Sequence, residues 1–159
     1  MTHRSSEPAA SARPMVWFPD TSALVTLAVH PPLQRAVAAT LSAYDLVLVE
    51  SVVAELEGLA GTPDAAAAWA GTALGQLDWL GAPVRVDDPA GTQLAVEIQE
   101  LIAGGRPLSH DMQHYGEAAI ISLASRAQRL QPLMLCDDYD ARVAAKNRNV
   151  EPFSGSYSA

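Results

Sequence analysis

Two apolar runs in this chain end directly in carboxylates. Asp20 follows residues 15–19, and residues 133–136 are followed by Asp137, Asp138 and Asp140. Because both runs read as strands, a parallel sheet would bring their carboxyl ends to one edge, where sites form in α/β folds. Carboxylates gathered without Lys or Arg beside them repel one another unless a cation binds, and hard divalent ions prefer oxygen ligands. The pattern therefore predicts a site for Mg²⁺ or Mn²⁺.

Two more acids stand where such a sheet could bring them to the same edge. Glu55 lies in the first turns of the helix predicted after the second strand, and Glu117 opens the most apolar helical stretch, residues 116–124. Taken singly, Asp is a common helix N-cap and Glu a common first-turn residue. The combination favours a shared site, because Asp20 and Asp138 interrupt otherwise apolar strand ends.

The elements that would position these acids alternate between strands and helices. Short apolar segments predict strands at residues 15–18, 46–49, 82–86 and 132–136, with an edge strand at 150–153. Longer patterns predict helices at residues 22–29, 31–44, 51–60, 62–80, 89–103, 109–127 (with a start as late as 116) and 141–147. This alternation is typical of a three-layer α/β fold, with helices on both faces of a central parallel sheet of four to five strands.

Length, composition and net charge limit the kinds of protein that this chain can be. The 159 residues suit one domain, at residues 14–159, after a flexible Ser-, Ala- and Pro-rich extension at residues 1–13. A single cysteine, Cys136, and the lack of a run of membrane-spanning length indicate a cytoplasmic protein with no membrane partner. The net charge of −8 repels phosphate overall. The basic residues of the last third form either a solvated surface or a phosphate-guiding rim: Arg126, Arg129, Arg142, Lys146 and Arg148.

The four acids lie in segments that resemble the motifs of the PIN domain family. In the family's order and spacing, these segments are residues 18–22, 53–56, 116–120 and 136–140. The resemblance implies a PIN-like sandwich and a metal-dependent ribonuclease whose catalytic residues are Asp20, Glu55, Glu117 and Asp138. It implies Mg²⁺ or Mn²⁺ held by Asp20, Glu117 and Asp138 with support from Asp137 and Asp140, and a hydroxyl close to the metal from Ser22. The chain departs from the commonest pattern at Glu117, where Asp is more usual, and Asp137 could replace Asp138 as the fourth acid.

The same resemblance bears on partners. Many bacterial PIN proteins are toxins similar to VapC proteins, so it implies an RNA substrate, an antitoxin protein and a homodimer. The Ala-rich helix carries apolar side chains that would belong either to the core or to such an interface: Trp69, Leu74, Leu77, Trp79 and Leu80.

Two other interpretations stay open on the sequence. One is a catalytically silent PIN-like module that binds RNA or protein; a missing acid would favour it, and none is missing. The other is a zinc site, since His110, His114 and Glu117 would share one face of a continuous helix. A pair of exposed or supporting histidines is the alternative to that zinc site.

Overall fold

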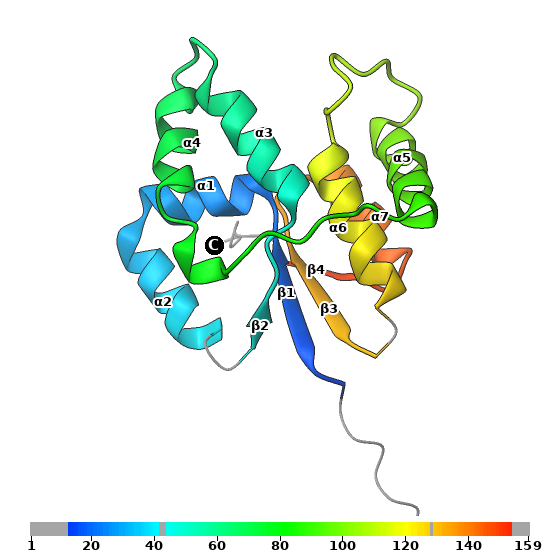
Figure 1. The fold of residues 1–159 in the computed structure, drawn as a ribbon, viewed down its shortest axis with the longest axis horizontal. Coiled ribbons are helices and arrows are strands. Elements are labelled where there is room, and N and C mark those ends of the chain that lie inside the picture. The colour runs from blue at the N-terminus through cyan, green and yellow to red at the C-terminus, as the bar shows by residue number, and fades with distance from the viewer. Residues whose placement is uncertain (1–12, 42–43, 128, 154–159) are drawn as a thin grey trace, which may run out of the picture.

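The computed structural model describes residues 13–41, 44–127 and 129–153, which form a parallel sheet flanked by helices (Figure 1). The strand order is β2-β1-β3-β4, and each pairing is parallel. The strands are β1 (Met15–Pro19), β2 (Asp45–Leu46), β3 (Gln131–Leu135) and β4 (Glu151–Phe153). The central strands β1 and β3 pair along their whole length, from Met15 opposite Gln131 to Pro19 opposite Leu135. Except for Arg13, the extension expected at residues 1–13 lies outside the described residues.

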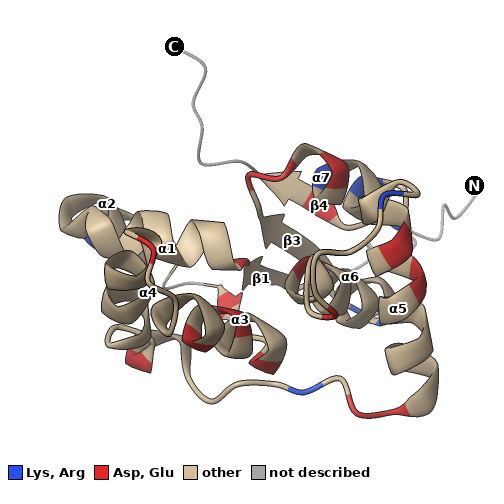
Figure 2. Ribbon diagram, turned by 90° about the horizontal axis from the view of Figure 1, so that it is seen from above, with Lys and Arg blue, Asp and Glu red and all other residues tan. Residues whose placement is uncertain are grey.

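The described residues also form the α-helices α1 (Thr21–Val29), α2 (Pro31–Leu41), α3 (Glu50–Ala60), α4 (Ala66–Leu74), α5 (Pro89–Ala103), α6 (Tyr115–Arg126) and α7 (Tyr139–Lys146). Seen from above, α1, α2 and α4 lie on one side of the sheet, whereas α5, α6 and α7 lie on the other (Figure 2). α3 packs against α4 and α1 in the first group and against α6 in the second, so it joins the two. The predicted α/β fold with a central parallel sheet is thereby confirmed.

Aspartates begin several of these helices. Because the first N–H groups of a helix have no partner within it, a side-chain oxygen at the N-cap stabilises the start. The pairs of carboxylate oxygen and backbone nitrogen are Asp20–Ala23 (2.8 Å), Asp88–Gly91 (3.0 Å) and Asp138–Ala141 (2.9 Å). Two of the three caps, Asp20 and Asp138, follow the neighbouring strands β1 and β3. The capping rule and the strand order together therefore bring two acids to one edge of the sheet.

The core lies between the sheet and the apolar faces of the helices. Its fully buried side chains include Val52, Leu56, Ile98, Ile120, Ile121 and Met134, and burial of each such side chain stabilises the fold by about 1.5–3 kcal/mol. Most apolar side chains of the Ala-rich segment belong to this core: Leu80 is buried, and Leu74, Leu77 and Trp79 pack against it. Trp69 is different, since 54% of its surface is exposed.

Residues 82–86 do not form the predicted strand. Only Val84 makes a bridge, with Val49, through hydrogen bonds from Val84 N to Leu48 O (2.7 Å) and from Glu50 N to Val84 O (2.8 Å). The segment is exposed over residues 82–85, and Pro83 has no N–H to donate to a ladder. The strand predicted at 46–49 is likewise short, because only β2 and the single bridge at Val49 pair there.

One helix is shorter than predicted, and another begins near the late end of its predicted range. The Ala-rich helix ends at Leu74 before Gly75, and a 3₁₀ turn at Asp78–Leu80 replaces its last part. α6 begins at Tyr115, close to the latest start predicted for it, because the chain turns through His114, which has a positive φ of 62°. Among the described residues, no helix combines the length and the apolar character that a membrane crossing needs.

Candidate metal centre

Asp20 is a buried carboxylate at the carboxyl end of β1. Only 1% of its surface is exposed, and its backbone N–H donates to the Leu135 carbonyl at 3.0 Å, which ties the ends of β1 and β3 together. Its Oδ1 accepts hydrogen bonds from Ala23 N (2.8 Å) and from Ser22 Oγ (2.9 Å). Burial raises the pKa of Asp20 from 3.8 to about 6, although the hydrogen bond from Ala23 acts in the opposite direction. The side chain is therefore held in one orientation, but its hydrogen bonds do not offset the cost of burying its negative charge.

Glu55 projects from α3 towards the start of α6. At that point α6 has Gly116, where a Cβ atom would lie 2.5 Å from Glu55 Oε2. The absence of a side chain at Gly116 is thus what allows the carboxylate to lie against α6. Burial, followed by the negative charge of Glu117, raises the pKa of Glu55 from 4.5 to about 7. The Glu55 carboxyl therefore loses its proton less readily than an exposed Glu does.

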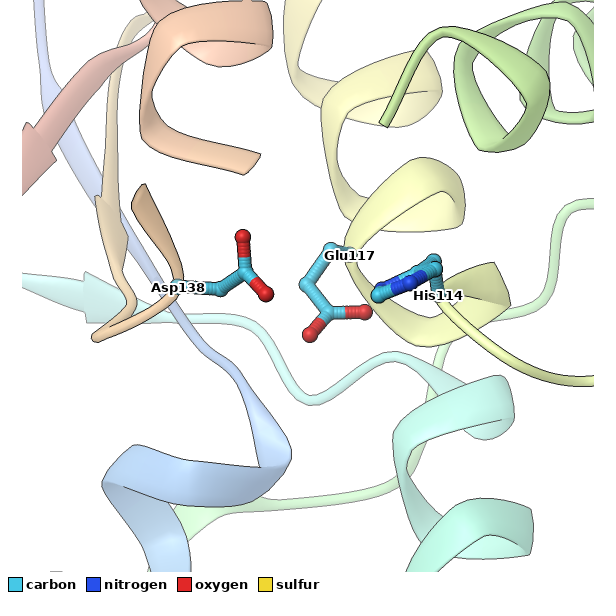
Figure 3. Close-up of side chains that lie close together, drawn as sticks. All are labelled: His114, Glu117 and Asp138. Carbon is cyan, nitrogen blue, oxygen red and sulfur yellow. The ribbon is translucent and has the colours of Figure 1, made fainter. Parts of the chain in front are cut away.

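Glu117 and Asp138 complete the cluster from the starts of α6 and α7. Burial raises the pKa of Glu117, and the charge of Asp138 adds to that rise, whereas His114 opposes it. One ligand atom each from His114, Glu117 and Asp138 lies within 4.8 Å of the others. Figure 3 shows that the Asp138 carboxylate and the His114 ring lie on either side of the Glu117 carboxylate. Three groups able to bind a metal therefore converge from two helix starts.

The cluster holds more negative charge than the nearby chain compensates. The ion pairs Arg85–Glu50 (2.9 Å), Arg106–Asp140 (3.2 Å) and Arg126–Asp88 (2.6 Å) use none of the four central acids. In the view from above, acidic positions lie at the end of β1 and on α3 and α6 (Figure 2). Each central acid interacts electrostatically with at least one other: Asp20 with Glu117, Glu55 with both, and Glu117 with Asp138.

Several buried oxygens of this region have no hydrogen-bond partner. They are Oε2 of Glu55, Oε2 of Glu117 and Oγ1 of Thr21. Buried polar groups are nearly always paired, and an ion or ordered water is a common partner when the protein supplies none. Unpaired oxygens beside mutually repelling carboxylates suit a divalent cation, because it would satisfy the oxygens and offset the charge.

The other predicted site residues lie around this centre. The Ser22 hydroxyl donates to both carboxylate oxygens of Asp20, at 2.9 and 3.1 Å. Asp140 turns to Arg106, which is itself held by the Ala103 carbonyl (2.8 Å). Asp137 is exposed and does not belong to the converging group, whereas Asp138 does. Of the two candidates for the fourth acid, Asp138 is thus the one that the fold brings next to Glu117.

His114 is the residue that sequence reasoning left out of the acid cluster. The predicted zinc arrangement, with His110, His114 and Glu117 on one helix face, is wrong because α6 begins only at Tyr115. His110 is exposed in the preceding turn, while His114 is partly buried and close to Glu117. The three-residue spacing between His114 and Glu117 could have indicated from the sequence that these two side chains lie close together. It could not have indicated that Asp138, at the start of α7, joins them.

The basic residues of the last third have varied surroundings. Arg126 donates two hydrogen bonds to Asp88, at 2.9 and 2.6 Å, and so clamps the end of α6 to the start of α5. This contact lowers the pKa of Asp88 to about 2. The Arg142 guanidinium lies 6.0 Å from the centre of the exposed Tyr139 ring. Arg126 therefore has a structural role in joining α6 to α5, whereas a phosphate-guiding rim stays a prediction.

Cys136 is buried and free, as its strand-end position predicts. Burial and the neighbouring Asp20 raise the pKa of its thiol well above its ordinary value, so it is an inert group beside the cluster.

No family model matches the chain, and no curated protein matches it. Function is therefore inferred from the residues and their geometry.

Proposed function

We propose that this protein is a metal-dependent endoribonuclease, which hydrolyses phosphodiester bonds in RNA. The observation that carries the proposal is the gathering of Asp20, Glu55 and Glu117 beside Asp138: the three carboxylates have raised pKa values, and among the described residues none of them forms an ion pair with Lys or Arg. Such an arrangement destabilises a folded protein unless a cation binds, so a role in metal binding explains why it is present.

Glu117 and Asp138 would hold the metal, with Asp20 beneath them. When bound, one or two Mg²⁺ or Mn²⁺ ions would neutralise charge on the phosphate and lower the pKa of a bound water. Asp20 has a hydroxyl donor in Ser22 and a backbone donor in Ala23, which hold its carboxylate in a fixed orientation. The protein therefore supplies a fixed set of oxygens rather than a flexible acidic loop.

Glu55 is suited to moving a proton. Its pKa of about 7 lies near the working pH, where a general base or acid is most effective. Its position against Gly116 leaves Oε2 without a protein partner. We assign Glu55 the removal of a proton from the attacking water, which distinguishes it from the acids that hold metal.

The choice of RNA as substrate, and the partners, follow from the resemblance to PIN domains. The four acids match that family in order and spacing, from Asp20 to Asp138. The proposal extends to a cytoplasmic toxin of a toxin–antitoxin pair, with an antitoxin protein and a second copy of the chain as partners. The exposed ring of Trp69 on α4 is available for one of these contacts.

A cleavage assay with paired variants tests the proposal. Purified protein is mixed with a labelled pool of single-stranded RNAs in Mg²⁺, in Mn²⁺ and in excess EDTA. The test variant is Glu55→Gln, and the matched control is Glu57→Gln, which removes the same charge from an exposed position two residues along α3. We expect cleavage by the wild type and by Glu57→Gln only with metal, and a loss of about 100-fold or more for Glu55→Gln.

Cleavage that persists in EDTA would contradict the metal requirement. Equal cleavage by Glu55→Gln and the wild type would remove Glu55 from the reaction. A folded protein that binds Mn²⁺ and RNA but cleaves none of the pool would instead support the silent binding module.

A further inference from the structure

His114 is a strong candidate metal ligand outside the four acids. A ring nitrogen of His114 and one carboxylate oxygen each from Glu117 and Asp138 lie within 4.8 Å of one another. The ring and the two carboxylates come from both sides of one small space between the starts of α6 and α7 (Figure 3). A single ion there could contact all three groups. A site made of the four acids alone would leave the imidazole without a role.

The backbone at His114 does not explain why histidine stands there. The residue is the N-cap of α6, but its side chain makes no capping hydrogen bond. Its φ of 62° and ψ of 3° lie in the left-handed region, which Asn, Asp and His adopt more often than other non-Gly residues. This backbone thus accepts histidine without requiring it, since Asn or Asp would serve as well, and the imidazole, turned towards Glu117, is the part with chemistry to offer.

The position of His114 is set in advance by a buried glutamine. Gln99 of α5 is only 5% exposed, and its Nε2 donates to the carbonyls of Asp111 (2.8 Å) and Gln113 (2.7 Å). The Gln113 side chain accepts in turn from Ser109 N at 2.7 Å. The turn that carries His114 is therefore fastened to a core helix, as a ligand site requires.

A second observation next to this group also points to a bound ligand. Thr21 is more than nine-tenths buried, and its hydroxyl lies beside the Glu55 carboxyl and lowers the pKa of that group, although the two make no hydrogen bond of normal geometry. Glu117 Oε2 is buried and unpartnered as well. The Glu117 carboxylate of this group therefore has a buried oxygen that no described protein atom satisfies.

We propose that His114, Glu117 and Asp138 together bind one transition-metal ion, and that the imidazole makes this site prefer Mn²⁺, Co²⁺ and Zn²⁺ to Mg²⁺. Imidazole nitrogen is a good ligand for first-row transition metals, whereas Mg²⁺ selects oxygen and retains its waters. One nitrogen and two carboxylates leave positions open for water and a phosphate oxygen. This inference rests on the proposed function, which puts the metal beside Glu117 and Asp138. What it adds is the His114 ligand and the choice of metal ion.

The test uses the full chain after removal of metals, with His114→Asn as the variant. Asn tolerates the left-handed backbone and removes the imidazole, and His110→Asn is the control, because His110 is exposed and lies outside the group. Mn²⁺ affinity, Mg²⁺ competition and nitrogen coupling to bound Mn²⁺ are measured by electron paramagnetic resonance, including spin-echo modulation. We expect nitrogen coupling in the wild type and in His110→Asn, and its loss in His114→Asn. We also expect roughly tenfold or greater weakening of Mn²⁺ binding in His114→Asn, with a much smaller change for Mg²⁺.

Bound Mn²⁺ without nitrogen coupling in the wild type would overturn the inference, even if His114→Asn failed to fold. An unchanged ratio of Mn²⁺ to Mg²⁺ affinity in a folded His114→Asn would do the same. RNA cleavage measured on the same samples separates the two proposals. Nitrogen-coordinated Mn²⁺ without cleavage keeps this inference and ends the proposed function, whereas cleavage without nitrogen coordination does the reverse.

Discussion

Replacing Asp20 by Asn should stabilise the metal-free protein at neutral pH. Each pKa unit corresponds to about 1.4 kcal/mol, so a rise from 3.8 to about 6 makes the ionised side chain cost about 3 kcal/mol of folding free energy near pH 7.5. Asn keeps the oxygen that caps α1 at Ala23 and removes the charge. We therefore expect the free energy of unfolding to increase by about 2–3 kcal/mol, provided that EDTA is present.

The sign of this change in stability follows from the pKa of Asp20, which is higher in the folded protein than in the unfolded chain. The folded protein keeps a proton on Asp20 up to about pH 6, while the unfolded chain loses it near pH 4. The ionised carboxyl therefore destabilises the fold fully only above about pH 6, and the penalty shrinks as the pH falls towards the unfolded pKa of 3.8. The advantage of Asp20→Asn should shrink to about 0.5 kcal/mol at pH 4. Urea denaturation of both proteins at several pH values, in EDTA, measures this trend.

Asp88→Asn is the matched control, because Asp88 is also an N-cap aspartate. Arg126 lowers the pKa of Asp88 to about 2, so its charge stabilises the fold above pH 4 and that effect is lost as the pH falls to 2. The same substitution should thus have the opposite sign at pH 7.5. The reasoning would be refuted if Asp20→Asn lowered stability in EDTA at pH 7.5, since its carboxylate would then be net stabilising.

Three further outcomes follow from the same contacts. Gly116→Ala should abolish most cleavage, because its Cβ would displace Glu55 Oε2, but should keep the thermal midpoint within a few degrees; Gly58→Ala, which has open space at its Cβ, should remain active. Gln99→Leu should lower the free energy of unfolding by about 1–3 kcal/mol, measured in urea, because two backbone carbonyls lose a donor that is itself buried. Millimolar Mn²⁺ should raise the melting temperature of the wild type at pH 7.5 and have a much smaller effect near pH 4, where the acids are protonated; an unchanged midpoint at pH 7.5 would argue against a clustered site.

Much of the framework follows from local sequence signals. Apolar segments ending in Asp20 and Asp138 predicted the central strands and their helix caps, because an N-cap side chain and a buried strand are both recognisable within a few residues. The same signals indicated that acids would gather at the carboxyl edge. They failed at residues 82–86, where an apolar appearance did not distinguish a strand from an exposed segment with one bridge.

The contacts inside the site depend on how the helices pack. Glu55 can approach α6 only because Gly116 has no side chain. The two residues are 61 positions apart, and the local sequence around one gives no indication of its contact with the other. Asp140 looked equivalent to Asp138, but the fold turns it to Arg106, which lies in the loop after α5. Long-range pairings of this kind are decided by tertiary geometry rather than by residue type.

The chain by itself determined the fold class and predicted both the edge of the sheet at which acids would meet and the four acids that we propose as catalytic. Only the tertiary structure decided that His114 joins Glu117 and Asp138, because α6 starts at Tyr115 and not five or six residues earlier. That start depends on Gln99, a buried side chain of another helix that holds the preceding turn. Periodicity describes a helix once it has begun, whereas its first residue here is set by hydrogen bonds from elsewhere in the molecule.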